Sequence, residues 1–471
     1  MNGKVLRVII QLYNSAKSCV FCDGQKSQFF RSNIGVRQGE NLSPVLFALY
    51  LNDFQDFLQE RCNGLSSLSS EISGMVNDNL IESYINLFTL LYADDTIVLG
   101  ESPQELQLAL DAVHDYCQKW RLFVNTSKTK VVIFSRGKVR KVPTFIFGSD
   151  ILNVCYDYVY LGITFNYNNT FKKAIDKQVN QASRAMFALK CKSESLRLPI
   201  DVQLQLFDQL VLPILLYGCE VWGFEALNQI ETFYLKFCKK LLGVHKNTPN
   251  CMVYGELGKY KLESIVANRM LMFWYRLVHG KEGKISCVLY SFHYSLFNSG
   301  VHAMGWIQKI KNLLDGLGFS DLWRNQASNI GLSLFKSIVT KRLNDMNSQD
   351  WHCEVNANPQ CVVYRIFKHT LIFEKYLLCL GEAERKLLCR FRCLNNKLPI
   401  VIGRYAHVPR CERLCTQCSL NLIGDEFHYL FECPAFEESR RQALKSIFGN
   451  ILTHLKWIRF LTTPIRKCSW G

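Results

Sequence analysis

The sequence of 471 residues lacks any apolar run that approaches the ~20 residues needed to cross a bilayer. Its longest apolar stretch lies near residues 210–216, is short and contains Pro213. Residues 1–18 also lack the basic start, apolar middle and small-residue end of a signal peptide, because Lys4 and Arg7 interrupt their apolar stretch. We therefore expect a soluble intracellular protein that is neither secreted nor membrane-spanning.

Internal repeats and extended low-complexity segments are also missing, and the composition is that of a globular chain. At ~150 residues per domain, the length predicts roughly three domains. Apolar residues make up 48% of the sequence and charged residues 20%, which excludes a largely disordered polypeptide. In an intracellular protein the 20 cysteines are most simply reduced thiols, with metal ligation as the exception.

The excess of positive charge lies entirely in the second part of the chain. Residues 1–165 carry a net charge of −1, whereas residues 166–471 carry +17. Such a region attracts a polyanion, for which we expect nucleic acid; a merely solubilising surface is the alternative. The basic amphipathic pattern over residues 171–190 has the same two interpretations, nucleic-acid contact or an ordinary solvated face.

The local pattern predicts an α+β fold in which a sheet is backed by helices. Ser43 and Pro44 favour a helix start, with Ser43 as its cap, and apolar residues recur at helical spacing as far as Leu58. A second helix is predicted from the capping-box pattern at Ser102 and Glu105 through Trp120. Short strands are expected over residues 27–34, 87–92, 96–99, 131–134 and 158–165, and helices dominate from Phe171 onward.

Two adjacent acids, Asp94 and Asp95, stand between two apolar strand segments and are predicted to occupy the tip of a tight hairpin. Adjacent carboxylates repel each other and resist burial unless a cation offsets their charge. Mg²⁺ prefers such hard oxygen ligands and needs only one or two carboxylates beside substrate phosphates. A solvent-exposed Asp-Asp turn without a metal is the alternative.

Two motifs are Tyr92-Ala93-Asp94-Asp95 and, before it, Gly35 to Gly39 with Leu42-Ser43-Pro44. They resemble the polymerase turn and the nucleotide-pocket motif in the reverse transcriptase domain of non-LTR (LINE-type) retrotransposons. Phe123-Val124-Asn125 with Lys128-Thr129-Lys130 is similar to the next palm motif, and Tyr160 to Ile163 to the hairpin that borders the thumb. The resemblance implies a partial polymerase palm, with a mixed or antiparallel sheet and helices, followed by a helical thumb.

The resemblance also assigns roles to residues. Asp94, with Asp95 as its weaker partner, would bind two Mg²⁺ ions ~4 Å apart for in-line nucleotidyl transfer. Residues for the incoming nucleotide and template would be Arg37, Gln38, Gly39, Lys128 and Lys130. Gly39 also suits any tight turn, and an exposed strand-end position is the alternative for each lysine.

The family's two-metal site needs a further aspartate from an upstream motif that we do not find. The early acid Asp23, in Cys22-Asp23-Gly24, has the pattern of a hairpin turn. Because both ions would be bridged by the absent aspartate, we expect little or no polymerase activity from this chain. It resembles an N-terminally truncated element product without fingers, and without the residue that sorts deoxynucleotides from ribonucleotides.

The distal half continues the resemblance. Several short segments are similar to the thumb of the same elements. They are Leu212-Pro213, Leu216-Tyr217-Gly218, Glu220, Trp222, Leu241 to Val244, Thr248-Pro249 and Tyr254 to Gly258. We expect residues 1–168 to form the palm remainder, 169–280 the thumb, 281–395 a helical connection of unknown role, 396–440 a zinc region and 441–471 a C-terminal tail.

Near the C-terminus, Cys415, Cys418, His428 and Cys433 follow a C-x2-C-x9-H-x4-C spacing. Two thiolates three residues apart bind one ion from a tight turn, and a nearby His and Cys complete a tetrahedral Zn²⁺ site. The alternatives are a small core of reduced thiols, or Cys411 as a competing ligand. With Arg404, Arg410 and Arg413 before it and Tyr405, Phe427, Tyr429 and Phe431 available for stacking, the region resembles the C-terminal zinc knuckle of LINE-type elements, which implies RNA binding.

The sequence thus predicts an RNA-directed DNA polymerase domain whose partners are an RNA template, a DNA primer or target, and deoxynucleoside triphosphates. No membrane partner is expected, and the sequence identifies no protein partner. The family implies residence in the nucleus, with the cytoplasm as the alternative. A non-catalytic RNA- or DNA-binding protein that retains the fold as a scaffold is the rival function.

Overall fold

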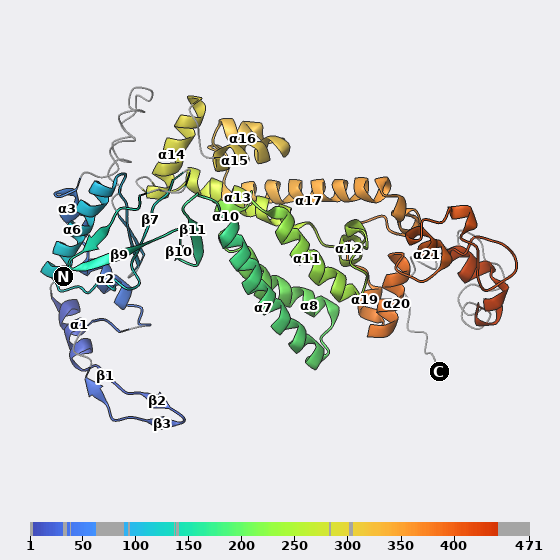
Figure 1. Ribbon diagram of the computed structural model, residues 1–471, viewed down its shortest axis with the longest axis horizontal. Helices are drawn as coiled ribbons and strands as arrows, with labels where there is room; N and C mark the ends of the chain where they lie inside the picture. The colour runs from blue at the N-terminus through green and yellow to red at the C-terminus, as the bar shows by residue number, and fades with distance from the viewer. Residues whose placement is uncertain are drawn as a thin grey trace. The chain divides into compact units, whose positions relative to one another are not determined.

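The computed structural model of the chain describes residues 3–31, 35–37, 39–62, 89–92, 95–135, 137, 141–281, 284–300 and 305–440. The chain divides into two compact units (Figure 1). Unit 1 comprises residues 1–131 and 139–155, and unit 2 comprises residues 132–138 and 156–471. Helices and strands both occur, as an α+β fold requires.

Unit 1 contains most of the strands and four described helices. The helices are α1 (Lys4–Asn14), α2 (Ser43–Tyr50), α3 (Phe54–Gln59) and α6 (Pro103–Trp120). The strands are β1 (Lys17–Ser18), β2 (Phe21–Cys22), β3 (Gln25–Lys26), β4 (Phe30–Arg31), β5 (Thr89–Tyr92), β6 (Asp95–Val98), β7 (Lys130–Val132), β8 (Phe145–Phe147) and β9 (Asp150–Cys155).

The strands of unit 1 form small sheets among the described residues, not the single helix-backed sheet expected. Strands β1 and β4, β2 and β3, and β5 and β6 make antiparallel pairs, and β7, β9 and β8 make a three-stranded sheet in that order. The β2–β3 turn is the predicted one. Asp23 and Gly24 both have positive φ, 49° and 82°, which is the backbone that a two-residue hairpin turn requires.

Helix α6 is the centre of packing in unit 1. The predicted capping box is present, because the Ser102 hydroxyl accepts from the Glu105 amide (3.2 Å) and the Glu105 carboxylate accepts from the Ser102 amide (3.3 Å). Tyr116, fully buried on α6, packs against Phe54 of α3 and donates its hydroxyl to Asp53 (2.6 Å). The helix thereby fixes α3 beneath it.

Several sequence predictions for unit 1 were wrong in detail. The helix expected from Ser43 to Leu58 is two helices, α2 and α3, interrupted at residues 51–53. Ser43 is not the cap that accepts an amide; it is the first helical residue and donates its hydroxyl to the Arg37 carbonyl (2.5 Å). The hairpin of β8 and β9 was not predicted at all, and the expected strand 27–34 is reduced to β4 among its described residues.

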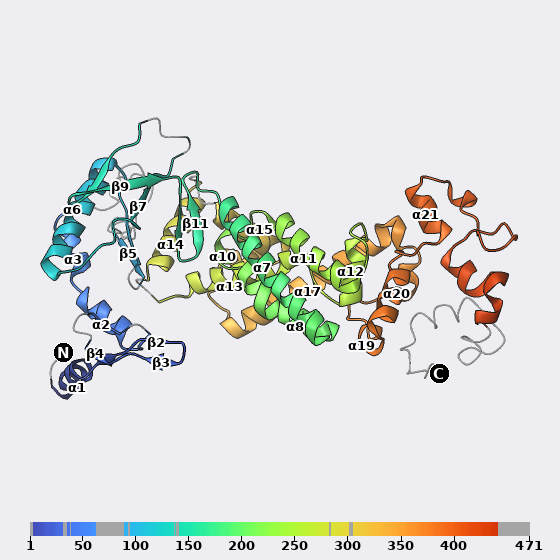
Figure 2. The ribbon, with the colours of Figure 1, turned by 60° about the horizontal axis from the view of Figure 1, so that its bottom comes forward.

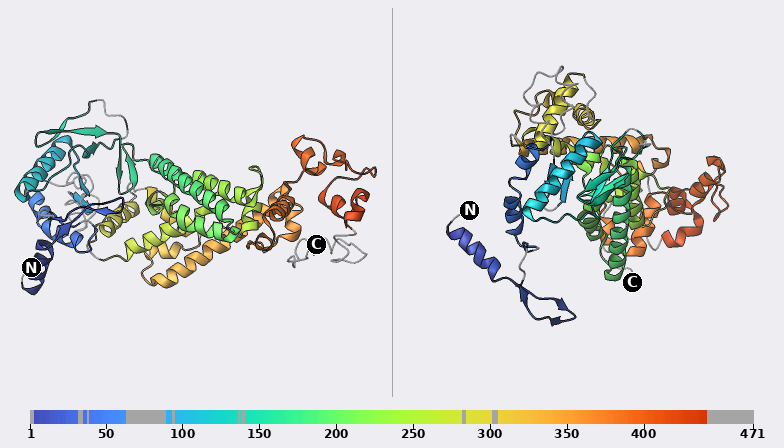
Figure 3. Two further views of the ribbon diagram at one scale, coloured as in Figure 1. Left: turned by 90° about the horizontal axis from the view of Figure 1, so that it is seen from below. Right: turned by 60° about the vertical axis from the view of Figure 1, so that its left-hand side comes forward.

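Unit 2 begins with a hairpin and is otherwise helical (Figure 3). The strands are β10 (Asp157–Tyr160) and β11 (Ile163–Asn166). They form the hairpin that the resemblance implied at Tyr160 to Ile163, although the local pattern had predicted one strand over 158–165. The first helices are α7 (Lys172–Leu196), α8 (Ile200–Leu206), η1 (Phe207–Val211), α9 (Leu212–Leu215), α10 (Cys219–Trp222), α11 (Leu227–Leu242), α12 (Asn250–Leu257) and α13 (Leu262–Val278). The later ones are α14 (Ile285–Asn298), α15 (Gly305–Gly316), α16 (Ser320–Arg324), α17 (Leu332–Ala357), η2 (Pro359–Cys361), α18 (Tyr364–Phe367), α19 (Tyr376–Cys379), α20 (Glu382–Arg392), α21 (Pro399–Tyr405), η3 (Arg410–Glu412), η4 (His428–Glu432) and η5 (Pro434–Phe436).

One hydrophobic core runs through unit 2, from Ile175 on α7 to Val401 on α21. Trp222 and Trp274 are fully buried in it, and helices from both sides of residue 280 contribute to it. The β10–β11 hairpin is joined to the segment after α9 by the exposed Tyr217, which donates its hydroxyl to the Leu161 carbonyl (2.9 Å). Residues 169–280, expected as a thumb, and residues 281–395, expected as a connection, therefore pack into the same hydrophobic core.

A buried network of charges lies inside unit 2. Glu256 on α12 is inaccessible to solvent and accepts two hydrogen bonds from the Arg392 guanidinium, at 3.0 Å from both Nε and Nη2. Arg392 also pairs with Glu374 (3.2 Å), which in turn pairs with the buried Lys368. Tyr376 donates its hydroxyl to Glu256 (2.5 Å). The network joins α12 to the segment that follows α17.

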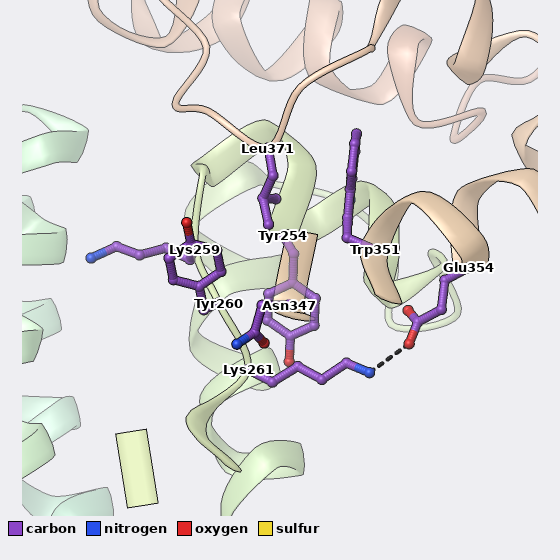
Figure 4. Close-up of a pocket in the computed structure, with 8 residues that line it drawn as sticks. All are labelled: Tyr254, Lys259, Tyr260, Lys261, Asn347, Trp351, Glu354 and Leu371. Carbon is purple, nitrogen blue, oxygen red and sulfur yellow. Dashed lines mark hydrogen bonds and ion pairs between the residues drawn. The ribbon is translucent and has the colours of Figure 1, made fainter. Parts of the chain in front are cut away.

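A small hollow lies beside α12 and is also lined by charged pairs (Figure 4). Lys261 pairs with Glu354 across it, and Tyr254 donates its hydroxyl to Glu231. These pairs satisfy the charged groups at its edge and leave little room for a ligand. Among the described residues, no helix is both long enough and apolar enough to span a membrane.

Candidate functional site

The hairpin of β5 and β6 carries the predicted acidic turn. The two strands pair from Thr89 with Val98 to Tyr92 with Asp95, so the register is that of a tight antiparallel hairpin. Asp95 is the first residue of β6 and is exposed to solvent. Asp94 and Ala93 lie outside the described residues. One of the two predicted metal-binding carboxylates is thus at the end of a hairpin and accessible.

The segment before α2 carries the predicted nucleotide-pocket residues. Gly39 has φ of 85° with open space around its α-carbon, so a side chain there would meet backbone strain and not a steric clash. Arg37 is held by α1, because its guanidinium donates to the Leu12 carbonyl (3.2 Å) and lies over the Tyr13 ring. Gln38 lies outside the described residues.

The two predicted lysines flank a turn at the start of β7. The Asn125 side chain accepts from the Lys128 amide (3.2 Å), which orders the turn. Lys128 is exposed, whereas Lys130 is half-buried and donates to the Ser127 carbonyl (2.9 Å). Among the described residues, no hydrogen bond or ion pair joins either lysine, Arg37 or Asp95 to one another.

The four C-terminal Cys and His residues do come together. One ligand atom from each of Cys415, Cys418, His428 and Cys433 lies within 4.8 Å of all the others. The sulfurs of Cys415 and Cys433 are 3.8 Å apart, and the Cys418 sulfur is 3.3 Å from Nε2 of His428. Around a zinc ion with Zn–S bonds of ~2.3 Å, tetrahedral geometry places two sulfurs ~3.8 Å apart. The donor set therefore fits Zn²⁺.

Two short backbone structures bring these ligands together. Leu414 and Ile423 form an antiparallel bridge, and the Cys415 amide donates to the Leu422 carbonyl (2.8 Å), which folds the Cys415–Cys418 turn back on itself. His428 and Cys433 lie on one wide helical turn, closed by the Cys433 amide donating to the His428 carbonyl (2.7 Å).

Local hydrogen bonds also suit metal binding. Burial by itself would raise the pKa of the Cys415 thiol, but bonds from the Gln417 amide and Tyr429 lower that pKa to about 6, which favours the thiolate. The Nδ1 atom of His428 lies 3.4 Å from the Glu432 carboxylate, an outer partner of the kind that orients a metal-bound imidazole through Nε2.

The neighbours predicted around this group divide into two kinds. Cys411 is exposed and does not belong to the four-residue group, so the structure gives no support to it as a ligand. Arg413 is engaged internally, because its guanidinium donates to the carbonyls of Val408 (2.9 Å) and Ile400 (3.1 Å). Arg410 and Tyr405 are exposed, whereas Phe427 and Phe431 pack against the core.

A protein family and several known proteins are similar to parts of this chain. The family model for reverse transcriptase (RNA-dependent DNA polymerase) matches residues 4–165. The RNA-directed DNA polymerase of the mobile element jockey from Drosophila funebris is 24% identical over 250 residues, which covers 52% of this chain and 25% of that protein. The polymerase of the transposon X-element from Drosophila melanogaster is 22% identical over 246 residues, covering 48% and 24%.

A transposon-derived protein of Caenorhabditis elegans is 29% identical over 165 residues, which covers 34% of this chain and 58% of that protein. The chain thus spans about a quarter of the length of the two polymerases. Residues 4–165 match the polymerase family, and the similarity to the jockey polymerase covers about half of the chain. Residues 4–165 are therefore a reverse transcriptase domain, and over about half of its length the chain is similar to RNA-directed DNA polymerases of the mobile elements jockey and X-element.

Proposed function

We propose that the chain binds an RNA template with a DNA primer or target and supplies the acidic hairpin of an RNA-directed DNA polymerase. The observation that carries this proposal is the exposed carboxylate of Asp95 at the end of an antiparallel hairpin, within the segment that matches the reverse transcriptase family. An exposed acid between apolar strands has no packing role.

Each predicted site residue has a proposed role in binding metal, nucleotide or template. Asp94 and Asp95 would hold Mg²⁺, which when bound activates the primer 3′-hydroxyl and stabilises the departing pyrophosphate. The flexible backbone at Gly39, with Arg37 and Gln38, would border the incoming deoxynucleoside triphosphate and the template. Lys128 is exposed and free to approach the triphosphate, whereas Lys130 is held by a backbone carbonyl.

The proposed catalytic site would need a further carboxylate beside Asp94 and Asp95. Among the described residues, Asp95 does not belong to any group of three side chains able to hold a metal ion. The resemblance implies that both Mg²⁺ ions would be bridged by a further aspartate from an upstream motif, which we do not find in the sequence. We therefore propose that this chain, by itself, polymerises very slowly or not at all.

Primer extension on poly(rA)/oligo(dT) tests this proposal. We expect incorporation by the chain to match that of its Asp95→Asn variant. Asp23→Asn, which changes an acid in the β2–β3 turn, is the matched control, since Asn tolerates positive φ. The proposal of an incomplete site would be contradicted if the chain incorporated nucleotides, if Asp94→Ala or Asp95→Asn abolished this activity, and if Asp23→Asn left it intact.

We also propose that Cys415, Cys418, His428 and Cys433 bind one structural Zn²⁺. Two sulfurs at the separation of a tetrahedral edge support this assignment over a core of reduced thiols. The chain purified without added chelator should contain one zinc per polypeptide by plasma emission spectroscopy. The Cys415→Ser variant should lose it and Cys411→Ser should keep it; equal zinc content in the two variants would refute the site.

Around these sites we propose residues 1–168 as a palm remainder, 169–280 as a thumb, 281–395 as a connection and 396–440 as a zinc-bearing region. Residues 441–471, expected as a tail, lie outside the described residues. Nucleic-acid templates and chromosomal targets make the nucleus the expected compartment, which fluorescence microscopy of a tagged chain would test.

A non-catalytic scaffold that binds RNA or DNA is the second candidate function. The net charge of +17 over residues 166–471 favours it, since that region needs no metal site to attract a polyanion. Both functions predict binding of an RNA/DNA hybrid that weakens steeply with added salt. They differ in primer extension. When a separate polypeptide that carries the upstream aspartate motif is added, a polymerase should extend the primer, whereas a non-catalytic scaffold should not.

A further inference from the structure

A cluster of basic side chains forms where three helices of unit 2 meet. The residues come from the C-terminal half of α7, the last turn of α11, the loop after α11, and α20 (Figure 2). We call this cluster the basic ridge; its residues are Lys190, Lys239, Lys240, Lys246, Lys386 and Arg390. Lys190 belongs to the basic pattern over residues 171–190, whereas the other five residues lie in no predicted motif.

Packing at the end of α11 assembles the ridge. Gly243 ends the helix with φ of 68°, and a Cβ there would lie 2.8 Å from Cγ of Lys386, so the aliphatic part of Lys386 lies directly on the glycine. Arg390 donates from Nε to the Gly243 carbonyl (2.7 Å). These two contacts fix α20 against α11 and bring the positive groups of both helices together.

Like charges meet in the ridge. The ammonium group of Lys190 lies against that of Lys240 and lowers the pKa of Lys240, and Lys236, one turn earlier, adds to this effect. Glu194 pairs with Lys190 (3.5 Å) and Glu382 pairs with Lys386. The other four ridge residues have no ion pair with an acid in the part of the chain that the structure describes, so the ridge keeps a net positive charge.

A purely structural role explains part of the ridge. Lys239 and Lys240 lie in the last turn of α11, where basic residues interact favourably with the helix dipole, and Lys239 also donates to the Lys246 carbonyl (2.8 Å) in the following loop. It does not explain the contact between Lys190 and Lys240, which repels, or the exposed Lys246. A chain of regularly spaced anions would offset both.

We propose that the basic ridge binds the phosphodiester backbone of a nucleic acid, an assignment that rests on the proposed nucleic-acid binding and locates it in unit 2. The contacts are to phosphates and not to bases, because the six ridge residues offer only ammonium and guanidinium groups. Removing charge from the ridge should therefore weaken the binding of RNA and of DNA with the same sequence to the same extent.

Fluorescence anisotropy with a labelled 20-nucleotide RNA, and with DNA of the same sequence, tests the ridge in the full chain. The variant is Lys240→Gln/Lys246→Gln/Arg390→Gln. The matched control is Lys336→Gln/Lys341→Gln/Arg342→Gln on α17, which removes the same charge from exposed positions and also includes an arginine that donates from Nε to a carbonyl, that of Leu317 (3.1 Å). Circular dichroism verifies that each variant is folded.

We expect the ridge variant to bind at least tenfold more weakly than the parent chain near 0.1 M salt, with the slope of log K against log salt reduced by ~2, since each lost phosphate contact removes ~0.7. The control should bind within twofold of the parent. If the ridge variant is unstable, Lys240→Gln/Lys246→Gln keeps the Arg390 bond and should reduce the slope by ~1.4.

Equal loss in the ridge variant and the α17 control, or unchanged binding by the ridge variant, would overturn the ridge while leaving the proposed function intact. Loss of DNA binding alone, with RNA binding kept, would overturn recognition through the shared phosphate backbone. A parent chain that binds neither polymer would refute the proposed function together with the ridge.

Discussion

The buried pair of Glu256 and Arg392 provides the most sensitive test of the structure. Both side chains are almost inaccessible, and two guanidinium nitrogens lie 3.0 Å from the carboxylate oxygens. Burial opposes ionisation of Arg392, but the neighbouring carboxylates of Glu256 and Glu374 raise the pKa of its guanidinium. We expect Glu256→Gln, which keeps the shape and removes the charge, to destabilise unit 2.

The magnitude follows from what the substitution leaves behind. Removing one partner of a buried ion pair costs about 3–5 kcal/mol, because the other charge stays buried. Glu374 remains 3.2 Å from Arg392 and offsets part of that charge, so the lower end, about 3 kcal/mol, is expected. Adding Arg392→Met to Glu256→Gln should recover about 2 kcal/mol, since the unpaired charge is then gone.

Urea unfolding followed by circular dichroism measures these changes. Glu194→Gln, which breaks the exposed pair with Lys190, is the control and should cost less than about 1 kcal/mol. The reasoning fails if Glu256→Gln destabilises no more than Glu194→Gln, or if the effects of Glu256→Gln and Arg392→Met are additive.

Three further predictions concern other parts of the chain. Stripping bound metal with a chelator should lower the unfolding temperature of the parent chain but not of Cys415→Ser, and an equal shift in both would contradict the zinc assignment. Ser102→Ala should destabilise unit 1 by about 1 kcal/mol in urea unfolding, because it removes the cap of α6, whereas Ser102→Asp should be nearly neutral. Burial raises the pKa of the Glu231 carboxyl above its ordinary 4.5, so its contribution to stability is complete below that pH and is lost as the pH rises through the raised value. Relative to the parent, Glu231→Gln should therefore gain stability between pH 4.5 and pH 7, and a constant difference across that range would refute the shift.

Features encoded by neighbouring residues could be predicted from the sequence. The capping box at Ser102 and Glu105, the positive-φ turn at Asp23 and Gly24, and the meeting of Cys415 with Cys418 each depend on a few consecutive positions. Periodicity also predicted α7, although the helix continues past Lys190 to Leu196.

Features set by distant partners could not be predicted. Glu256 and Arg392 are 136 residues apart, and neither has a local pattern that distinguishes it from a surface charge. Ser43 matched a cap in isolation, but the carbonyl of Arg37 takes its hydroxyl. The break between α2 and α3 likewise interrupts an apolar period that continues in the sequence without a Gly or Pro at residues 51–53.

The single core of unit 2 has a consequence for dissecting the chain. Trp274 packs against Trp323 and Phe335, so side chains from opposite sides of residue 280 cover one another. A fragment that stops at residue 280 would leave this aromatic surface uncovered and prone to aggregate. Limited proteolysis should accordingly release unit 2 as one resistant piece, and a recombinant fragment of residues 169–280 should be expressed with the helices that follow it.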